Sequence, residues 1–298
     1  MKRRTPSETA LRIAGNFAAA ATDPELRPLL ADPDTPYWAS FVRAHSWNAR
    51  FRLFLWTFPP TRRLAYRLTE AVLPGSALYI LARKRCVEDA VREALRDGAT
   101  QAVSFGAGFD PLFLRLAGEF PGVRFFEIDH PDTQAVKQRA LLTTGILPER
   151  LLLLSADFSR ETAADRLQAC ADFDAGAVTV FVAEGVLMYL LSDAVTTVFQ
   201  TVSRHGAPGS TLVFTVVEKE VLEDPSSIVA RAAVGLKRMG EPILSSHSRR
   251  NLDSELRRHG FRRAAVMDNV LLKNKYLTPL KMDRDLIAGE LIVTARRQ

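Results

Sequence analysis

Gly106-Ala-Gly108-Phe-Asp110 and, farther along the chain, Gly122-Val-Arg-Phe-Phe-Glu-Ile-Asp129 decide the fold that this sequence predicts. The first stretch is a glycine-rich turn behind a short apolar strand, and the second is a strand that ends in a carboxylate. In an open α/β sheet, such glycines let the backbone approach a nucleoside, and such a carboxylate accepts hydrogen bonds from the ribose hydroxyls. Gly106, Gly108 and Asp129 therefore predict a nucleoside site at the edge of a sheet.

Pro111 stands where a dinucleotide-binding turn has its third glycine. That glycine lets the helix and the strand pack closely over a pyrophosphate. Proline instead suits the start of the helix predicted at 111–119. The turn therefore argues against NAD as the ligand.

Two further apolar strands also deliver carboxylates. The strand predicted at 151–155 is followed by Asp157 and Phe158, and the strand predicted at 177–183 is followed by Glu184. The carboxyl ends of parallel strands meet at one edge of the sheet, where such folds bind ligands. A single loop carboxylate is common, but three at matching strand ends after a glycine turn indicate a binding site.

The remaining periodicity predicts a doubly wound, seven-stranded Rossmann-like α/β sheet. We expect a helical N-terminal cap over residues 1–95 and a catalytic domain over 96–298, with a cap insertion at about 219–248 because that connection is long. Strands are expected at 101–106, 123–128, 151–155, 177–183, 210–217, 262–268 and 289–295. Helices are expected at 7–21, 38–56, 60–72, 77–96, 111–119, 132–143, 160–169, 191–204 and 249–259.

Five stretches together resemble the leucine carboxyl methyltransferase family, and in particular its bacterial branch of S-adenosylmethionine-dependent O-methyltransferases, often found near polyketide pathways. The likeness runs from about residue 7 to residue 261, and Pro111 departs from it because the family usually has Thr there. The five stretches are Ala82-Arg83-Lys-Arg-Cys-Val-Glu-Asp89, Ser104 to Asp110, Phe126-Glu-Ile-Asp-His-Pro131, Ala156-Asp157-Phe158 and Ala183-Glu184-Gly-Val-Leu-Met-Tyr189.

The resemblance implies S-adenosylmethionine as the cofactor and a sheet whose last strand is antiparallel. It also implies that Arg83 pairs with the methionine carboxylate of the cofactor, a role that suits a planar fork of donors. Arg85 is a weaker candidate, because it can pair with Asp89 one helical turn farther on. Glu184 is expected near the amino acid part and the methyl group.

The other cofactor contacts follow from the same resemblance. Gly106 and Gly108 would admit the methionine part, and Asp129 would hold the ribose. Asp157 and Phe158 would frame the adenine. Their places at the ends of three successive strands agree with this arrangement.

Methyl transfer to a carboxylate needs no general base, because a carboxyl group is already ionised at neutral pH, whereas a phenol or another hydroxyl would usually need one. His45 and His247 lie in the expected cap segments and are the candidate bases for a hydroxyl acceptor. Tyr189 is a further candidate that is equally compatible with a core position. The absence of a dedicated base motif favours a carboxylate acceptor.

The net charge of +6 arises entirely in the first 100 residues, which contain 16 Lys+Arg and 10 Asp+Glu. Arginines alternate there with aromatic side chains. An amphipathic helical layer with a solvated basic face explains this pattern, and so does a cap that attracts an acidic small-molecule acceptor. Nucleic-acid or membrane-surface binding is the least favoured interpretation, because Lys is nearly absent and no recognition motif is present.

The composition predicts a cytoplasmic enzyme. No apolar run approaches the ~20 residues that a membrane span needs, and the two cysteines read as thiols of a reducing compartment. No cluster of residues predicts a metal site. A cofactor-binding protein that has lost catalysis is the alternative from another class, and the oligomeric state is left open.

Overall fold

The computed structural model describes residues 8–30, 35–145, 148–158, 161–238 and 240–298. A seven-stranded sheet with the order β3-β2-β1-β4-β5-β7-β6 forms its centre. All neighbouring strands are parallel except β7, which is antiparallel to β5 and β6. The predicted doubly wound fold is thus confirmed, as is the antiparallel last strand. The strands are β1 (Gln101–Phe105), β2 (Arg124–Asp129), β3 (Leu151–Ser155), β4 (Thr179–Ala183), β5 (Thr211–Val217), β6 (Phe261–Met267) and β7 (Glu290–Arg297).

Alternate strand residues divide between two hydrophobic cores, one on each face of the sheet. Ala102 and Phe125 belong to one core, and their neighbours Val103 and Phe126 belong to the other. The first core is completed by α5 (Ser76–Arg96), α6 (Leu112–Glu119) and α7 (Pro131–Thr144). The second is completed by α8 (Ala163–Gln168), α9 (Ser192–His205) and α12 (Leu252–Arg258).

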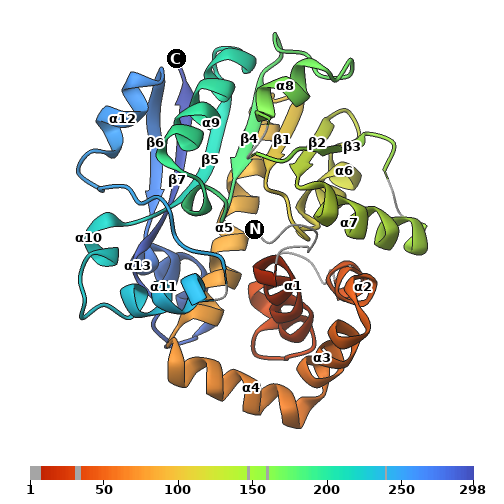
Figure 1. The fold of residues 1–298 in the computed structure, drawn as a ribbon, viewed down its shortest axis with the longest axis vertical. Coiled ribbons are helices and arrows are strands. Elements are labelled where there is room, and N and C mark those ends of the chain that lie inside the picture. The colour runs from red at the N-terminus through yellow and green to blue at the C-terminus, as the bar shows by residue number, and fades with distance from the viewer. Residues whose placement is uncertain (1–7, 31–34, 146–147, 159–160, 239) are drawn as a thin grey trace.

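The N-terminal helices pack against the first core as a further layer, at the bottom of the molecule in Figure 1. They are α1 (Glu8–Ala21), α2 (Thr35–His45), α3 (Trp47–Thr57) and α4 (Pro59–Val72). The prediction of one helix over 38–56 is wrong, because the helix is interrupted at Ser46, between the end of α2 and the start of α3. The Ser46 hydroxyl accepts a hydrogen bond from the Ala49 N–H at 3.2 Å, which starts α3 as an N-cap.

The long connection predicted at 219–248 contains α10 (Lys219–Leu222) and α11 (Ile228–Arg238). Near its end, Glu241 accepts a hydrogen bond from Thr9 of α1, which joins this segment to the N-terminal layer. The proposed division of the chain at residue 95 stays a prediction.

Two further helices differ from the prediction. Helix α13 (Asn269–Leu272) was not predicted, and α8 begins at Ala163, later than predicted; residues 159–160 lie outside the described chain. Within the described part of the chain, no helix has the length and apolar character of a membrane span.

Candidate active site

The glycine turn after β1 needs glycine at both predicted positions. Gly106 has a φ of +66° and Gly108 a φ of +54°, which side chains rarely adopt. A Cβ atom on Gly106 would also lie 2.7 Å from Cγ2 of Val186. On its other side the turn meets the N-terminal layer, because a Cβ atom on Gly108 would lie 3.4 Å from that of Ala10 in α1.

Asp129 lies directly beside this turn, at the end of β2. The Gly108 N–H donates to Oδ2 of Asp129 at 2.5 Å, and the His130 N–H donates to Oδ1 at 2.6 Å. Burial raises the pKa of Asp129, and these two backbone hydrogen bonds oppose the rise. A carboxylate has about four lone-pair positions, so both oxygens can still accept a hydroxyl proton. The structure therefore brings the predicted ribose-binding residue to the predicted turn.

Arg83 of α5 lies in a buried network of carboxylates. Its Nε is 2.9 Å from Oε1 of Glu184, and its Nη1 is 2.9 Å from Oε2 of Glu290. Burial would lower the pKa of Arg83, but Glu290 and Glu184 reverse this and raise it. Nη2 is the one guanidinium nitrogen for which the described residues provide no hydrogen bond, and it remains able to donate to a ligand.

Lys84 links Glu184 to the glycine turn. Its Nζ lies 3.0 Å from Oε2 of Glu184 and 2.6 Å from Oδ2 of Asp110. Asp110 also accepts a hydrogen bond from the Leu112 N–H at 3.0 Å, at the start of α6. Burial alone would raise the pKa of Asp110, but Lys84 and nearby cations bring it below its ordinary value. The ends of β1 and β4 are thus tied together by ion pairs.

The sequence did not single out Lys84 or Glu290 for this site. Lys84 stood inside a stretch that carried the family resemblance, but no role was assigned to it. Glu290 is the first residue of β7, and because β7 is antiparallel its beginning lies at the edge where the parallel strands end. A charged residue at the start of the last strand was the available signal.

The other predicted residues occupy varied positions. Asp157 and Phe158 follow β3, whose last residue pairs with Asp129, so they stand at the same edge of the sheet. Asp157 donates its backbone N–H to Glu161 at 3.2 Å, and Phe158 packs against the second core. The predicted pairing of Arg85 with Asp89 is confirmed, at 3.3 Å.

Of the candidate bases, His45 lies close to the glycine turn, where its ring packs edge-on against Phe109 with centroids 6.3 Å apart. Burial raises the pKa of Tyr189, and Glu241 adds to the rise, so its phenol stays protonated. His247 lies elsewhere, in a polar pocket beside α9 and α12, and binds Glu255. The three candidate residues therefore do not form a single site.

The charges at this edge fit the cofactor that the sequence predicted. Carboxylates outnumber cations at this edge. The carboxylates are Asp110, Asp129, Glu184 and Glu290, and the cations are Arg83 and Lys84. This excess of negative charge suits a ligand that carries a sulfonium and an ammonium group beside one carboxylate. Arg83 can donate to a carboxylate from Nη2, and both oxygens of Asp129 can accept further hydroxyl protons. Among the described residues, no group of His, Cys, Asp and Glu side chains has the arrangement of a metal site.

Known proteins are similar to this chain in sequence. The sequence profile described as leucine carboxyl methyltransferase matches residues 10–203. A protein of Mycolicibacterium gilvum, named provisionally as an S-adenosyl-L-methionine-dependent methyltransferase, is 33% identical over 209 residues, which are 68% of this chain and 64% of that protein. This chain thus spans just under two thirds of that relative. A protein of the same name from Mycolicibacterium smegmatis is 31% identical over 298 residues, covering 95% of this chain and 92% of its own.

Solved structures share the fold. One from Thermobifida fusca, described provisionally as a methyltransferase, has a TM-score of 0.58 at 16% identity and covers 100% of this chain and 97% of its own. A DUF574 family protein from Streptomyces avermitilis has a TM-score of 0.59 at 14% identity, covering 80% and 91%. At such low identities these two show the fold alone.

The names of the sequence relatives confirm S-adenosylmethionine as the predicted cofactor. The profile covers well over half of the chain and includes the glycine turn, Asp129 and Glu184. The chain belongs to the leucine carboxyl methyltransferase family.

Proposed function

We propose that the protein is a cytoplasmic S-adenosylmethionine-dependent O-methyltransferase that esterifies a carboxylate of an acidic small molecule, such as a polyketide-type secondary metabolite. The observation that carries this proposal is the buried network of Arg83, Lys84 and Glu184 beside the glycine turn and Asp129. These charged groups are fixed by one another, so little reorganisation is needed when a ligand arrives.

Each residue then has a distinct task. Asp129 accepts the ribose hydroxyls, and Asp157 with Phe158 borders the adenine. Arg83 donates from Nη2 to the methionine carboxylate, and Glu184 faces the amino acid part. The bound cofactor supplies a methyl group on a sulfonium. Holding the acceptor oxygen in line with that methyl group can contribute about 7–11 kcal/mol through proximity and orientation.

The acceptor is assigned from charge and from the family. Residues 35–69 contain six arginines and no Asp or Glu, so the layer that covers the glycine turn attracts anions. A carboxylate, with a pKa of about 4, is ionised and nucleophilic at neutral pH without a base. The description of the family also names a carboxyl group as the methylated group.

The runner-up is methylation of a phenol or another hydroxyl group. His45 supports it, because its ring packs against Phe109 within the glycine turn. Such a reaction would require the imidazole to take the hydroxyl proton. A neighbouring phenol is no substitute, because the raised pKa of Tyr189 keeps that side chain protonated.

Methyl-labelled S-adenosylmethionine and a panel of aromatic carboxylic acids, each matched with the phenol of the same skeleton, test the proposal. We expect label in the acids, released as methanol in mild alkali. The rate should stay level from about pH 6 to 8, because an acid of pKa ~4 remains ionised throughout.

Other results would change the assignment. An alkali-stable methyl group, with a rate that rises with pH and collapses in His45→Gln, would establish the hydroxyl acceptor. Calorimetry with S-adenosylhomocysteine and with NAD provides the control. Comparable affinity for NAD would overturn the cofactor site, and tight cofactor binding without transfer to any acceptor would favour a protein that has lost catalysis.

A further inference from the structure

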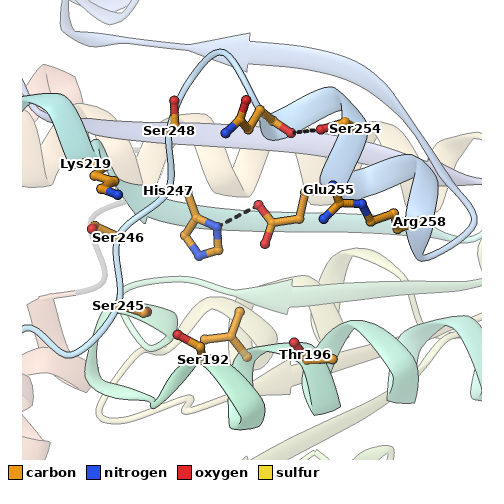
Figure 2. A pocket seen from close by; sticks show the side chains of 12 residues that line it. Ser192, Thr196, Lys219, Ser245, Ser246, His247, Ser248, Ser254, Glu255 and Arg258 are labelled. Carbon is orange, nitrogen blue, oxygen red and sulfur yellow. Dashed lines mark hydrogen bonds and ion pairs between the residues drawn. The ribbon is translucent and has the colours of Figure 1, made fainter.

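A polar pocket of about 400 Å³ lies on the second face of the sheet, between α9, α12 and the segment 245–248 (Figure 2). We call it the α9–α12 pocket, and its side chains include Ser192, Lys219, His247, Glu255 and Arg258. Its size is within the range of small-molecule sites. None of the roles proposed above for cofactor binding involves these residues.

His247 is held firmly in the wall of this pocket. Its backbone N–H donates to Val217 at 2.9 Å, and its carbonyl accepts from the Lys219 N–H at 3.0 Å, which extends the sheet beside the end of β5. Its Nδ1 lies 3.0 Å from Oε2 of Glu255, so Nδ1 carries the proton and donates. The hydrogen bond to Glu255 therefore occupies Nδ1 and leaves Nε2 as the ring nitrogen available to a ligand.

The second ring nitrogen, Nε2, is buried and has no hydrogen-bond partner among the described residues. The His247 side chain is 10% exposed. Figure 2 shows this nitrogen on the side of the ring away from Glu255, facing the space above Ser192. A buried polar atom without a partner is costly, and protonated imidazole can pair it with an anion.

The first turn of α9 lines the same space. Leu191 precedes the helix without a side-chain cap, and the first intrahelical hydrogen bond is donated by Val195 to Leu191. The N–H groups of Ser192, Asp193 and Ala194 thus lack helical acceptors, and this 14-residue helix directs its positive end there. The exposed Asp193 partly offsets that charge.

Two basic side chains complete the pocket. Lys219 is half exposed, with its Nζ 3.7 Å from Glu223, and Arg258 is exposed in the last turn of α12. The opposing carboxylate is Glu255, which is already bound by His247 and whose pKa that hydrogen bond lowers. The pocket therefore combines several donors with an excess of positive charge.

We propose that the α9–α12 pocket binds the oxyanion group of a small molecule, a carboxylate or a phosphate, between His247, Arg258 and the start of α9. Arg258 provides a planar fork, the backbone of α9 provides N–H groups, and His247 provides Nε2, which donates to an anion when the ring is in its imidazolium form. The site goes beyond the proposed methylation and does not depend on it.

Calorimetry on the full chain with inorganic phosphate and with acetate, each at ionic strength fixed with chloride, tests the site. We expect a millimolar or tighter Kd for at least one of them. Arg258→Ala and His247→Gln should each weaken binding at least tenfold. The neighbouring Arg257→Ala is the matched control and should bind as the parent does. The probe that binds more tightly identifies the chemical class.

Two results would overturn the proposal. One is no binding of either anion below about 10 mM. The other is an equal loss of binding in Arg257→Ala and Arg258→Ala, which would reveal general attraction to basic residues. His247→Gln is checked for folding by circular dichroism. If it unfolds, Arg258→Ala decides alone, because that exposed side chain can be removed without disturbing a core.

Discussion

The carboxyl edge of the sheet and the outer face of α3 and α4 both depart from the rule that charged groups are exposed and apolar groups are buried. At the edge, ionised groups are buried: the side chains of Arg83 and Glu184 are 7% and 4% exposed. On α3, large apolar groups are in water, with Trp47 79% and Phe51 61% exposed. Buried ions need partners that hold them, whereas exposed aromatic rings need none.

The difference shows which region is organised for chemistry. At the edge, removal of one ion leaves others uncompensated, so the arrangement is cooperative and fixed in advance. On α3, the exposed rings of Trp47, Phe51 and Phe54 follow one helical face, and Phe54 stacks on Phe58 just beyond the helix with centroids 5.7 Å apart. Substitutions should therefore have large, coupled effects at the edge and small, independent effects on the outer face.

Arg83→Ala should have the largest effect. It leaves Glu290 without its cation and Glu184 with only Lys84, so the free energy of unfolding in urea should fall by about 3–5 kcal/mol. Affinity for S-adenosylhomocysteine should also be lost. Arg83→Lys should recover stability in part but still bind poorly, because an ammonium lacks the planar fork.

The control for Arg83 is its own partner. Glu184→Gln keeps a hydrogen-bond acceptor for Arg83 and should reduce cofactor affinity less than Arg83→Ala does. If both Arg83 variants bind the cofactor as tightly as the parent, the guanidinium is a structural group of α5. The carboxyl edge and the outer face of α3 would then differ only in how much their residues contribute to stability.

Asp129→Ala should have the next effect. It removes hydrogen bonds to the ribose that contribute about 1.5–3 kcal/mol each, so calorimetry should show affinity reduced tenfold or more. The circular dichroism spectrum should remain that of the parent. Unchanged affinity in a folded variant would show that this carboxylate only caps the turn through Gly108 and His130.

The acidity of Asp129 gives that prediction a pH dependence. Because burial raises its pKa above the ordinary ~4, cofactor affinity should be constant at neutral pH and should fall as the pH drops through the raised value. The free energy of unfolding should change in the opposite direction. Because the raised pKa makes the folded state bind the proton before the unfolded state does, the ionised Asp129 lowers stability at neutral pH, and this loss disappears as the pH falls. In Asp129→Asn both dependences should be absent.

Trp47→Ser and Phe51→Ser should have the smallest effects, within about 0.5 kcal/mol in urea, because these rings are exposed. Trp38→Ala is the contrasting control. That ring is 3% exposed and stacks on Phe17 with centroids 4.5 Å apart, so its loss should cost about 3–5 kcal/mol. A loss at Trp47 as large as at Trp38 would mean that the outer face is covered in solution.

The sequence by itself determined the strands, the glycine turn and the acids at the strand ends. Short apolar runs placed all seven strands within two residues of their observed bounds, because the local sequence marks a buried strand. The turn at Gly106 and Gly108 and the carboxylate of Asp129 were equally readable, since each follows directly from an apolar strand. Local chemistry also set the break at Ser46, but a continuous apolar pattern masked it.

Only the tertiary structure decided which charges meet. Lys84 reaches both Glu184, 100 residues away, and Asp110. Glu290 joins Arg83 only because β7 runs antiparallel and starts at the carboxyl edge. The α9–α12 pocket likewise depends on 245–248 returning beside β5 to bring His247 against α12. Such contacts depend on strand order and direction, which local periodicity does not encode, and so the chemistry of the site emerged only when the sheet was assembled.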